Sequence, residues 1–214
     1  MSISPFKSDK ELVKFARFFF TAYVKSFRKD IAICLTTKED GEHAYFPALI
    51  TCIAFTDFMS GLYAGKLEHH GLPELLVYAK DFMNPAHYDQ LRLTILYEAF
   101  RHKLAHLAYP YVVFDTTTKA NRFAGHPPRR ITWTVYASNR TLPIEVVDFP
   151  TPQLITRSLT PWPVSYTCRV KISLPRFRTD IVKSIYGRSG YLRLLEADQN
   201  ARERFARCMK QYFN

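Results

Sequence analysis

The pattern of apolar residues changes at Pro110, and this change constrains the fold more than any other feature of the 214-residue chain. Before it, apolar side chains such as Leu93, Tyr97 and Phe100 recur three or four positions apart, which is typical of a helix with one buried face. After it, residues 131–137 alternate between apolar and polar in the manner of a strand. The chain is therefore predicted to be mainly α, a helical body with an added small antiparallel β-sheet and C-terminal helices (α+β overall).

The boundaries of the predicted elements follow from these patterns and from the Gly, Asn and Pro residues between them. Helices are predicted at about residues 8–29, 46–64, 73–82, 86–108, 177–186 and 191–213. Strands are predicted at about residues 111–115, 131–137, 142–147 and 165–174, with loops at Pro150, Pro152, Pro161 and Pro163. The regions 1–110, 111–175 and 176–214 are expected to pack together as one compact domain.

An excess of cations narrows the range of expected partners. The 30 Lys and Arg residues oppose 19 acids, and a formal charge of +11 favours a polyanionic partner such as nucleic acid, an acidic protein or an anionic membrane surface. The four cysteines are far apart and form no C-x-x-C pair, as in a reduced, cytoplasmic protein. No signal peptide is evident, and no uninterrupted apolar stretch reaches the ~20 residues that cross a membrane, so no membrane association is expected.

The first predicted helix begins with a capping-box pattern, Ser8 to Glu11, and carries its cations on one side. On an ideal helical wheel, Lys10, Lys14 and Arg17 fall in a basic stripe roughly 80° wide, opposite the apolar side chains. An ordinary solvated face explains this stripe well. The alternative is a surface that faces phosphate or lipid, and these are the residues that would bind RNA.

The most pointed chemical signal precedes Pro110 and has the pattern Arg-polar-x-x-x-His. Arg101 offers a planar fork of donors that grips phosphate, and His106 can exchange protons near neutral pH. His102 follows Arg101 directly, and Lys103 adds another cation. Together these residues predict a site that grips or cleaves RNA.

Two other interpretations of this segment stay open. His102 and His106 share one helical face, as metal ligands can, but no other ligand cluster completes a zinc site, so no metal is predicted. In the structural alternative, Glu98 forms a surface salt bridge with Arg101. Because five positions rotate a side chain by about 140° on an ideal helix, Arg101 and His106 would meet along a groove or across a two-fold axis.

A carboxylate interrupts the apolar helix predicted at residues 46–64. Asp57 lies among side chains that are expected to be buried, and an unpaired buried carboxylate is costly. It is therefore predicted to contact a basic or polar group on a neighbouring helix. By contrast, His69 and His70 follow a helix end, where adjacent histidines are expected to be solvated.

The motif resembles that of the HEPN superfamily, whose helical domains carry Arg-polar-x-x-x-His at the end of an apolar helix. The matching residues are Arg101, His102 and His106, and the helix around Asp57 resembles the one that packs beside the motif helix. The resemblance covers roughly residues 10–110. It implies a bundle that dimerises through its motif helices, and many such proteins are metal-independent endoribonucleases of toxin, antiphage or RNA-processing systems. It also implies a possible nucleotidyltransferase-type or antitoxin partner.

The resemblance leads to a homodimeric, metal-independent endoribonuclease that needs no cofactor. Arg101 is expected to hold the scissile phosphate, His106 to transfer a proton and His102 to assist, with Asp57 and Glu98 as supporting residues. The first alternative is a catalytically inactive homodimer of the same type that binds nucleotide, RNA or a protein. The second is a structural helical protein whose sheet carries its interactions.

Overall fold

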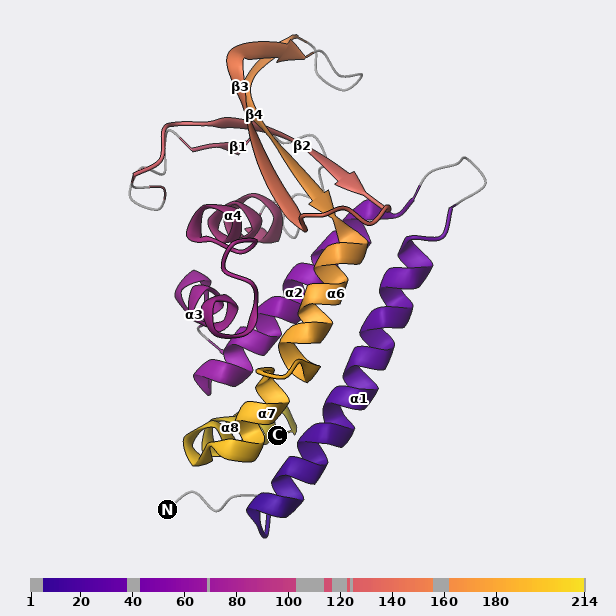
Figure 1. Ribbon diagram of the computed structural model, residues 1–214, viewed down its shortest axis with the longest axis vertical. Helices are drawn as coiled ribbons and strands as arrows, with labels where there is room; N and C mark the ends of the chain where they lie inside the picture. Colours follow the sequence, from indigo (N-terminus) through magenta and orange to yellow (C-terminus); the bar gives the residue numbers. More distant parts are fainter. Residues whose placement is uncertain are drawn as a thin grey trace.

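The computed structural model describes residues 6–37, 43–68, 70–102, 114–116, 123, 125–155 and 162–213. Its α-helices are α1 (Asp9–Cys34), α2 (Tyr45–Ala64), α3 (Leu72–Phe82), α4 (Gln90–Ile95), α6 (Leu174–Tyr186), α7 (Tyr191–Ala197) and α8 (Gln199–Phe213), and η1 (Leu96–His102) is a π-helix. Its strands are β1 (Phe114–Asp115), β2 (Arg130–Tyr136), β3 (Ile144–Ile155) and β4 (Val164–Ser173). The described chain is therefore mainly helical with one small sheet, which confirms the α+β class (Figure 1).

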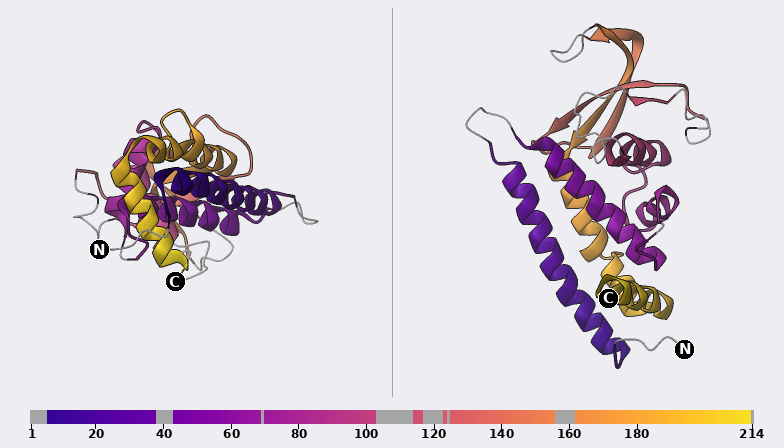
Figure 2. Two further views of the ribbon diagram at one scale, coloured as in Figure 1. Left: turned by 90° about the horizontal axis from the view of Figure 1, so that it is seen from below. Right: turned by 180° about the vertical axis from the view of Figure 1, so that it is seen from behind.

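Helix α1 begins where the capping box predicts and ends later than predicted. The Ser8 hydroxyl accepts a hydrogen bond from the Glu11 backbone N–H at 3.2 Å, so the first turn has a side-chain cap. The helix continues past the predicted end near residue 29 to Cys34, because Ile31 still falls on the buried side and is fully buried. Figure 2 shows α1 lying along the side of the body formed by α2 and α6.

Helix α2 is the central helix of the body. It packs against α1, α3, α6 and α8, and it ends at Gly65, which adopts the left-handed conformation (φ 79°) common at helix C-termini. By length and mean hydropathy (1.3) it is apolar enough to cross a membrane, but 61% of that stretch is buried inside the protein. An apolar surface on all sides is what a core helix needs when neighbours surround it.

The helix that carries the Arg-polar-x-x-x-His motif differs from its prediction. It begins at Gln90 instead of about residue 86, because the Asp89 side chain accepts from the Arg92 backbone N–H (2.8 Å) and caps it there. At Leu96 the helix changes from α to π geometry, which is rare in proteins and frequent at functional sites. The predicted continuation from 103 to 108 lies outside the described residues.

The sheet is mixed, and the prediction of an antiparallel sheet was wrong. The strand order is β1-β2-β4-β3, in which β2 and β4 run parallel while the other two pairs run antiparallel. Strand β4 takes the place beside β2 that the next strand in sequence, β3, would take in a simple meander. An alternating pattern fixes which face of a strand is buried, and it does not fix the direction of the neighbouring strand.

The predicted loop around Pro150 and Pro152 is part of a strand. Both prolines lie in β3, within a shift of register between Asp148 and Gln153. Strand β3 is at the edge of the sheet. An edge strand with an irregular register tolerates proline because the missing N–H interrupts no regular pairing.

One hydrophobic cluster joins the helices to the inner face of the sheet. It extends from Leu12 on α1 to Met209 on α8 and includes Val170 and Ile172 of β4. Strand β4 leads directly into α6, which packs against α1 and α2, so the C-terminal helices complete the body (Figures 1 and 2). Three cysteines are buried in the body: Cys52, Cys168 and Cys208.

Candidate functional site

The structure describes one of the three motif residues in full. The Arg101 side chain lies in the last turn of η1 and is one-third exposed. His102 ends η1, and its side chain is not described. Lys103 and His106 lie outside the described residues, so their predicted roles stay predictions.

Asp57 of α2 is the anchor of Arg101. Its Oδ2 accepts a hydrogen bond from Arg101 Nε at 3.0 Å and lies 2.8 Å from Nη2. Asp57 is 7% exposed, so its predicted burial and its predicted contact with a basic group of a neighbouring helix are confirmed. The predicted surface salt bridge from Glu98 to Arg101 is wrong, because Glu98 is 1% exposed and Arg101 pairs with Asp57.

The π-helix supplies a second support for the same guanidinium group. The Tyr97 hydroxyl accepts a hydrogen bond from Arg101 Nη1 at 3.1 Å. The guanidinium carbon also lies 4.7 Å from the centre of the Tyr97 ring, within the range of a cation–π contact. Arg101 is therefore held at two edges and over one face, which fixes its orientation.

His70 joins this site, which the sequence had not predicted. Its Nε2 lies 3.4 Å from Asp57 Oδ2, and only 11% of its side chain is exposed, so the expectation of a solvated histidine was wrong. The ring packs beside Gly61 of α2, where a Cβ atom would come within 3.3 Å of it. Gly61 lies one turn after Asp57, and this small residue next to a buried acid is the signal that could have pointed to His70.

Four side chains form one group, the Asp57 cluster: Asp57, His70, Tyr97 and Arg101. Burial raises the pKa of the Asp57 carboxyl, but His70 and Arg101 lower it by more, so that it stays ionised below its usual range. The Asp57 carboxylate in turn raises the pKa of His70 above its ordinary value, although burial opposes this shift. The cluster therefore holds the Asp57 carboxylate between the Arg101 guanidinium, which is positively charged, and the His70 imidazole, which can gain a proton near neutral pH.

A salt bridge organises the loop that brings His70 to the cluster. Glu74 Oε2 accepts from the Gly71 backbone N–H at 2.8 Å, and Glu74 Oε1 lies 2.6 Å from Lys66 Nζ. The Lys66 ammonium lowers the pKa of Glu74, despite burial, so this bridge is ionised at neutral pH. Gly71 also leaves room for the Tyr97 hydroxyl, which a Cβ atom would approach to 3.0 Å.

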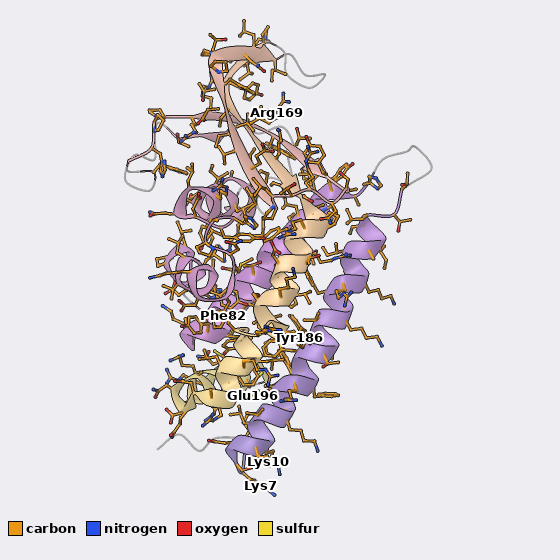
Figure 3. The ribbon with its side chains drawn as sticks, viewed as in Figure 1. Lys7, Lys10, Phe82, Arg169, Tyr186 and Glu196 are labelled. Atoms are coloured by element: carbon orange, nitrogen blue, oxygen red, sulfur yellow. The ribbon has the colours of Figure 1, made fainter. Side chains whose placement is uncertain are left out.

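The cations of the predicted basic stripe of α1 differ in exposure and in ion pairing. Lys10 and Lys14 are exposed, whereas Arg17 forms an ion pair with Glu196 of α7. Arg193 also pairs with Glu196, at 2.7 Å, at a shallow groove of about 260 Å³ between α1 and the C-terminal helices. Figure 3 shows Lys10 and Lys7 at the end of α1 near the N-terminus, with Glu196 nearer the middle of the molecule.

The described part of the chain holds no group of three or more His, Cys, Asp or Glu side chains that could bind a metal ion. The alternative site on His102 and His106 stays untested, since both side chains are among those not described. Comparison with protein-family models, with curated proteins and with solved structures found no match to this chain.

Proposed function

We propose that this protein is a metal-independent, RNA-cleaving enzyme of the HEPN type, with Arg101 as its phosphate-binding residue. The observation that carries the proposal is that one oxygen of Asp57 anchors Arg101 by a hydrogen bond and lies 3.4 Å from His70 Nε2. Enzymes that move protons and stabilise developing charge hold such groups in fixed positions with buried partners. The proposed fold type rests on the resemblance of the Arg-polar-x-x-x-His motif.

Arg101 suits the phosphate-binding role because its contacts leave part of the guanidinium available. Asp57 takes Nε and one side of Nη2, and Tyr97 takes one N–H of Nη1. Guanidinium has five N–H groups, so Nη1 and Nη2 keep donors for an anion. One-third of the side chain is exposed, and a phosphate from solvent would approach the guanidinium from this side. The positive charge would then stabilise the negative charge that develops on the phosphoryl oxygens.

His70 is proposed as the general acid of the reaction. A carboxylate that faces an imidazole favours its protonated form, and the pKa of His70 is raised for this reason. A protonated imidazole can give its proton to the leaving 5′-oxygen of RNA. Asp57 acts through His70 and Arg101, as a positioning residue.

His106 is proposed as the general base, following the motif. It would take the proton of the 2′-hydroxyl while the 2′-oxygen attacks the adjacent phosphorus. The bond from phosphorus to the 5′-oxygen then breaks, and that oxygen takes a proton from His70. The products are a 2′,3′-cyclic phosphate and a free 5′-hydroxyl, with no metal ion in the reaction. In the homodimer implied by the resemblance, motif helices of two copies would face one another.

One observation favours a second candidate function, a catalytically inactive domain that binds nucleotide, RNA or a protein partner. Each nitrogen of Arg101 already has a partner within the protein, as in a purely structural ion pair. Such a pair would lock η1 against α2 without any chemistry. The two functions differ in whether RNA is cleaved.

The test is cleavage of a labelled RNA by the native protein, by Arg101→Lys and by His106→Ala, with EDTA present. Arg101→Lys keeps a charge near Asp57 but loses the fork of donors. We expect each variant to cleave the RNA at least about 100-fold more slowly than the native protein. We also expect the native protein not to cleave an oligonucleotide of the same sequence that lacks the 2′-hydroxyls. Native protein that cleaves no RNA would favour the inactive alternative, and cleavage abolished by EDTA would favour the metal site on His102 and His106.

The oligomeric state can be measured on the same preparation. Light scattering is expected to give twice the mass of the 25.0 kDa chain at micromolar concentration. A monomer that still cleaves RNA would leave the proposed chemistry intact and remove the two-fold arrangement of the motif helices.

A further inference from the structure

The sheet has a second face that points away from the core. Along β4, Cys168, Val170 and Ile172 are buried, so Arg169 and Lys171 between them project from the opposite face. Figure 1 shows the sheet at one end of the helical body, and Figure 3 shows Arg169 near the end of the molecule opposite Lys7 and Lys10. None of the residues of the Asp57 cluster lies on this face.

Aromatic rings on this face are paired with arginines. The Arg140 guanidinium lies 4.1 Å from the centre of the Tyr136 ring, at the end of β2. The Arg169 guanidinium lies 5.6 Å from the centre of the Phe149 ring of β3. The outer sheet face is defined here as these two pairs and Lys171. Arg140 is exposed, and the other four side chains are partly exposed.

The register of the strands arranges these groups in a row. Arg169 is level with Thr132 of β2, which is buried, and Lys171 is level with Thr134, which is partly exposed. Tyr136 follows on the same face of β2, so the two arginine–aromatic pairs lie at the two ends of the row with Lys171 between them. Alternate residues of a strand are about 7 Å apart, which makes the row about 13 Å long.

The charge of this face is positive. Glu145 forms an ion pair with Lys171 at 3.2 Å, and Asp148, on the other face, pairs with Arg129 at 2.9 Å. Arg140 and Arg169 form no ion pair with a described residue and instead stack on rings. Cations that lie on aromatic rings and are at least partly exposed offer flat surfaces for bases and charge for phosphates, which is how sheets bind single-stranded nucleic acid.

We propose that the outer sheet face binds single-stranded RNA independently of the Asp57 cluster, and that it contacts a stretch of two or three nucleotides. Bases stack on the Tyr136–Arg140 and Phe149–Arg169 pairs, and the backbone between them passes Lys171. A flat acidic protein surface would meet the same charge but would make no use of the two stacked pairs. The inference goes beyond the proposed cleavage, because this surface would bind RNA even if the protein cleaved none.

The test compares two double variants of the full chain that lose the same charge. Arg140→Gln with Arg169→Gln changes the outer sheet face, and Lys10→Gln with Lys14→Gln changes the exposed stripe of α1. Binding of a fluorescent 2′-O-methyl RNA, which cannot be cleaved by 2′-oxygen attack, is followed by anisotropy at several salt concentrations. Unchanged circular dichroism melting shows that each variant is folded.

We expect the sheet variant to bind about 10-fold or more weakly, and the α1 variant to stay within about 3-fold of the native protein. Each phosphate that the sheet variant no longer neutralises should flatten the slope of log affinity against log salt by about 0.7. Equal reductions of affinity in the two variants would overturn the proposal, because they would show binding by overall charge. Native protein that binds an abasic oligonucleotide or a polyglutamate peptide as tightly as RNA would overturn it as well.

Stacking is tested by a pair of variants that keep every charge. Tyr136→Leu and Phe149→Leu remove the rings and leave the arginines, so they should weaken RNA binding about 5-fold or more each. Binding of abasic oligonucleotide should be unchanged in both. RNA affinity equal to that of the native protein in both variants would overturn the stacking geometry. Cleavage is not measured in any of these experiments, so failure here and failure of the proposed enzyme are distinguishable.

Discussion

The Asp57 cluster and the outer sheet face place arginines in opposite surroundings. Arg101 is tied to a buried carboxylate and a hydroxyl, so its charge is compensated and its position is fixed. Arg140 and Arg169 lie on aromatic rings, and neither forms an ion pair with a described residue. A fixed, compensated cation suits chemistry at one bond, whereas cations stacked on rings along a sheet face suit contact with a length of RNA. The contrast shows why the overall charge of +11 does not by itself locate a site.

The largest expected difference between the two regions is in stability. Arg101→Ala removes a partner of a buried carboxylate and is expected to lower the free energy of unfolding by about 2 kcal/mol, less than for a fully buried pair because Arg101 is partly exposed. Urea denaturation measures the change. Asp57→Ala should lower the free energy of unfolding by a similar amount. If the double variant is no less stable than either single variant, the two residues act as a pair.

Gly61→Ala is expected to be destabilising by about 1 kcal/mol. In an open helix the change would stabilise by about the same amount, since alanine is the better helix former. Here the added Cβ would lie 2.9 Å from the Lys66 backbone oxygen and 3.3 Å from the His70 ring, so the loop must shift. A higher melting temperature for Gly61→Ala would contradict the packing of His70 against α2.

The stability of the protein is expected to change with pH partly through His70. Because its folded pKa is raised, its contribution is full below the ordinary value of about 6.5 and is lost as pH rises through the folded pKa. Asp57, whose pKa is lowered, contributes above about pH 4 and loses this as pH falls. Urea midpoints of native protein and His70→Gln should therefore differ more at pH 5.5 than at pH 8.5. A constant difference would show that His70 does not titrate against Asp57.

The smallest effect on stability is expected at the outer sheet face. Arg140→Gln with Arg169→Gln should change the free energy of unfolding by no more than about 0.5 kcal/mol, because exposed cations contribute little. Differential scanning calorimetry at low and high salt is the check. A destabilisation as large as that of Arg101→Ala would mean that these arginines support the sheet and would remove the contrast between the regions.

Much of the helical body could be predicted from the sequence. Apolar periodicity located α1, α2 and α3 to within a few residues, and the cost of burying Asp57 unpaired predicted its basic partner. His70 was missed because its burial depends on where the loop after α2 packs, which no local pattern records. The parallel pairing of β2 with β4 is likewise a long-range feature. The π geometry of η1 has no marker in the apolar spacing either.

The most direct measurement is the pH dependence of RNA cleavage by native protein and by Asp57→Asn, with EDTA present. If Asp57 holds Arg101 and raises the pKa of a His70 that acts as general acid, the native rate should fall as pH rises through a pKa above about 6.5. In Asp57→Asn the maximal rate should drop at least about 10-fold, and this fall should move to lower pH. No cleavage by the native protein, or the same pH profile in both proteins, would contradict an RNA-cleaving site built on Asp57.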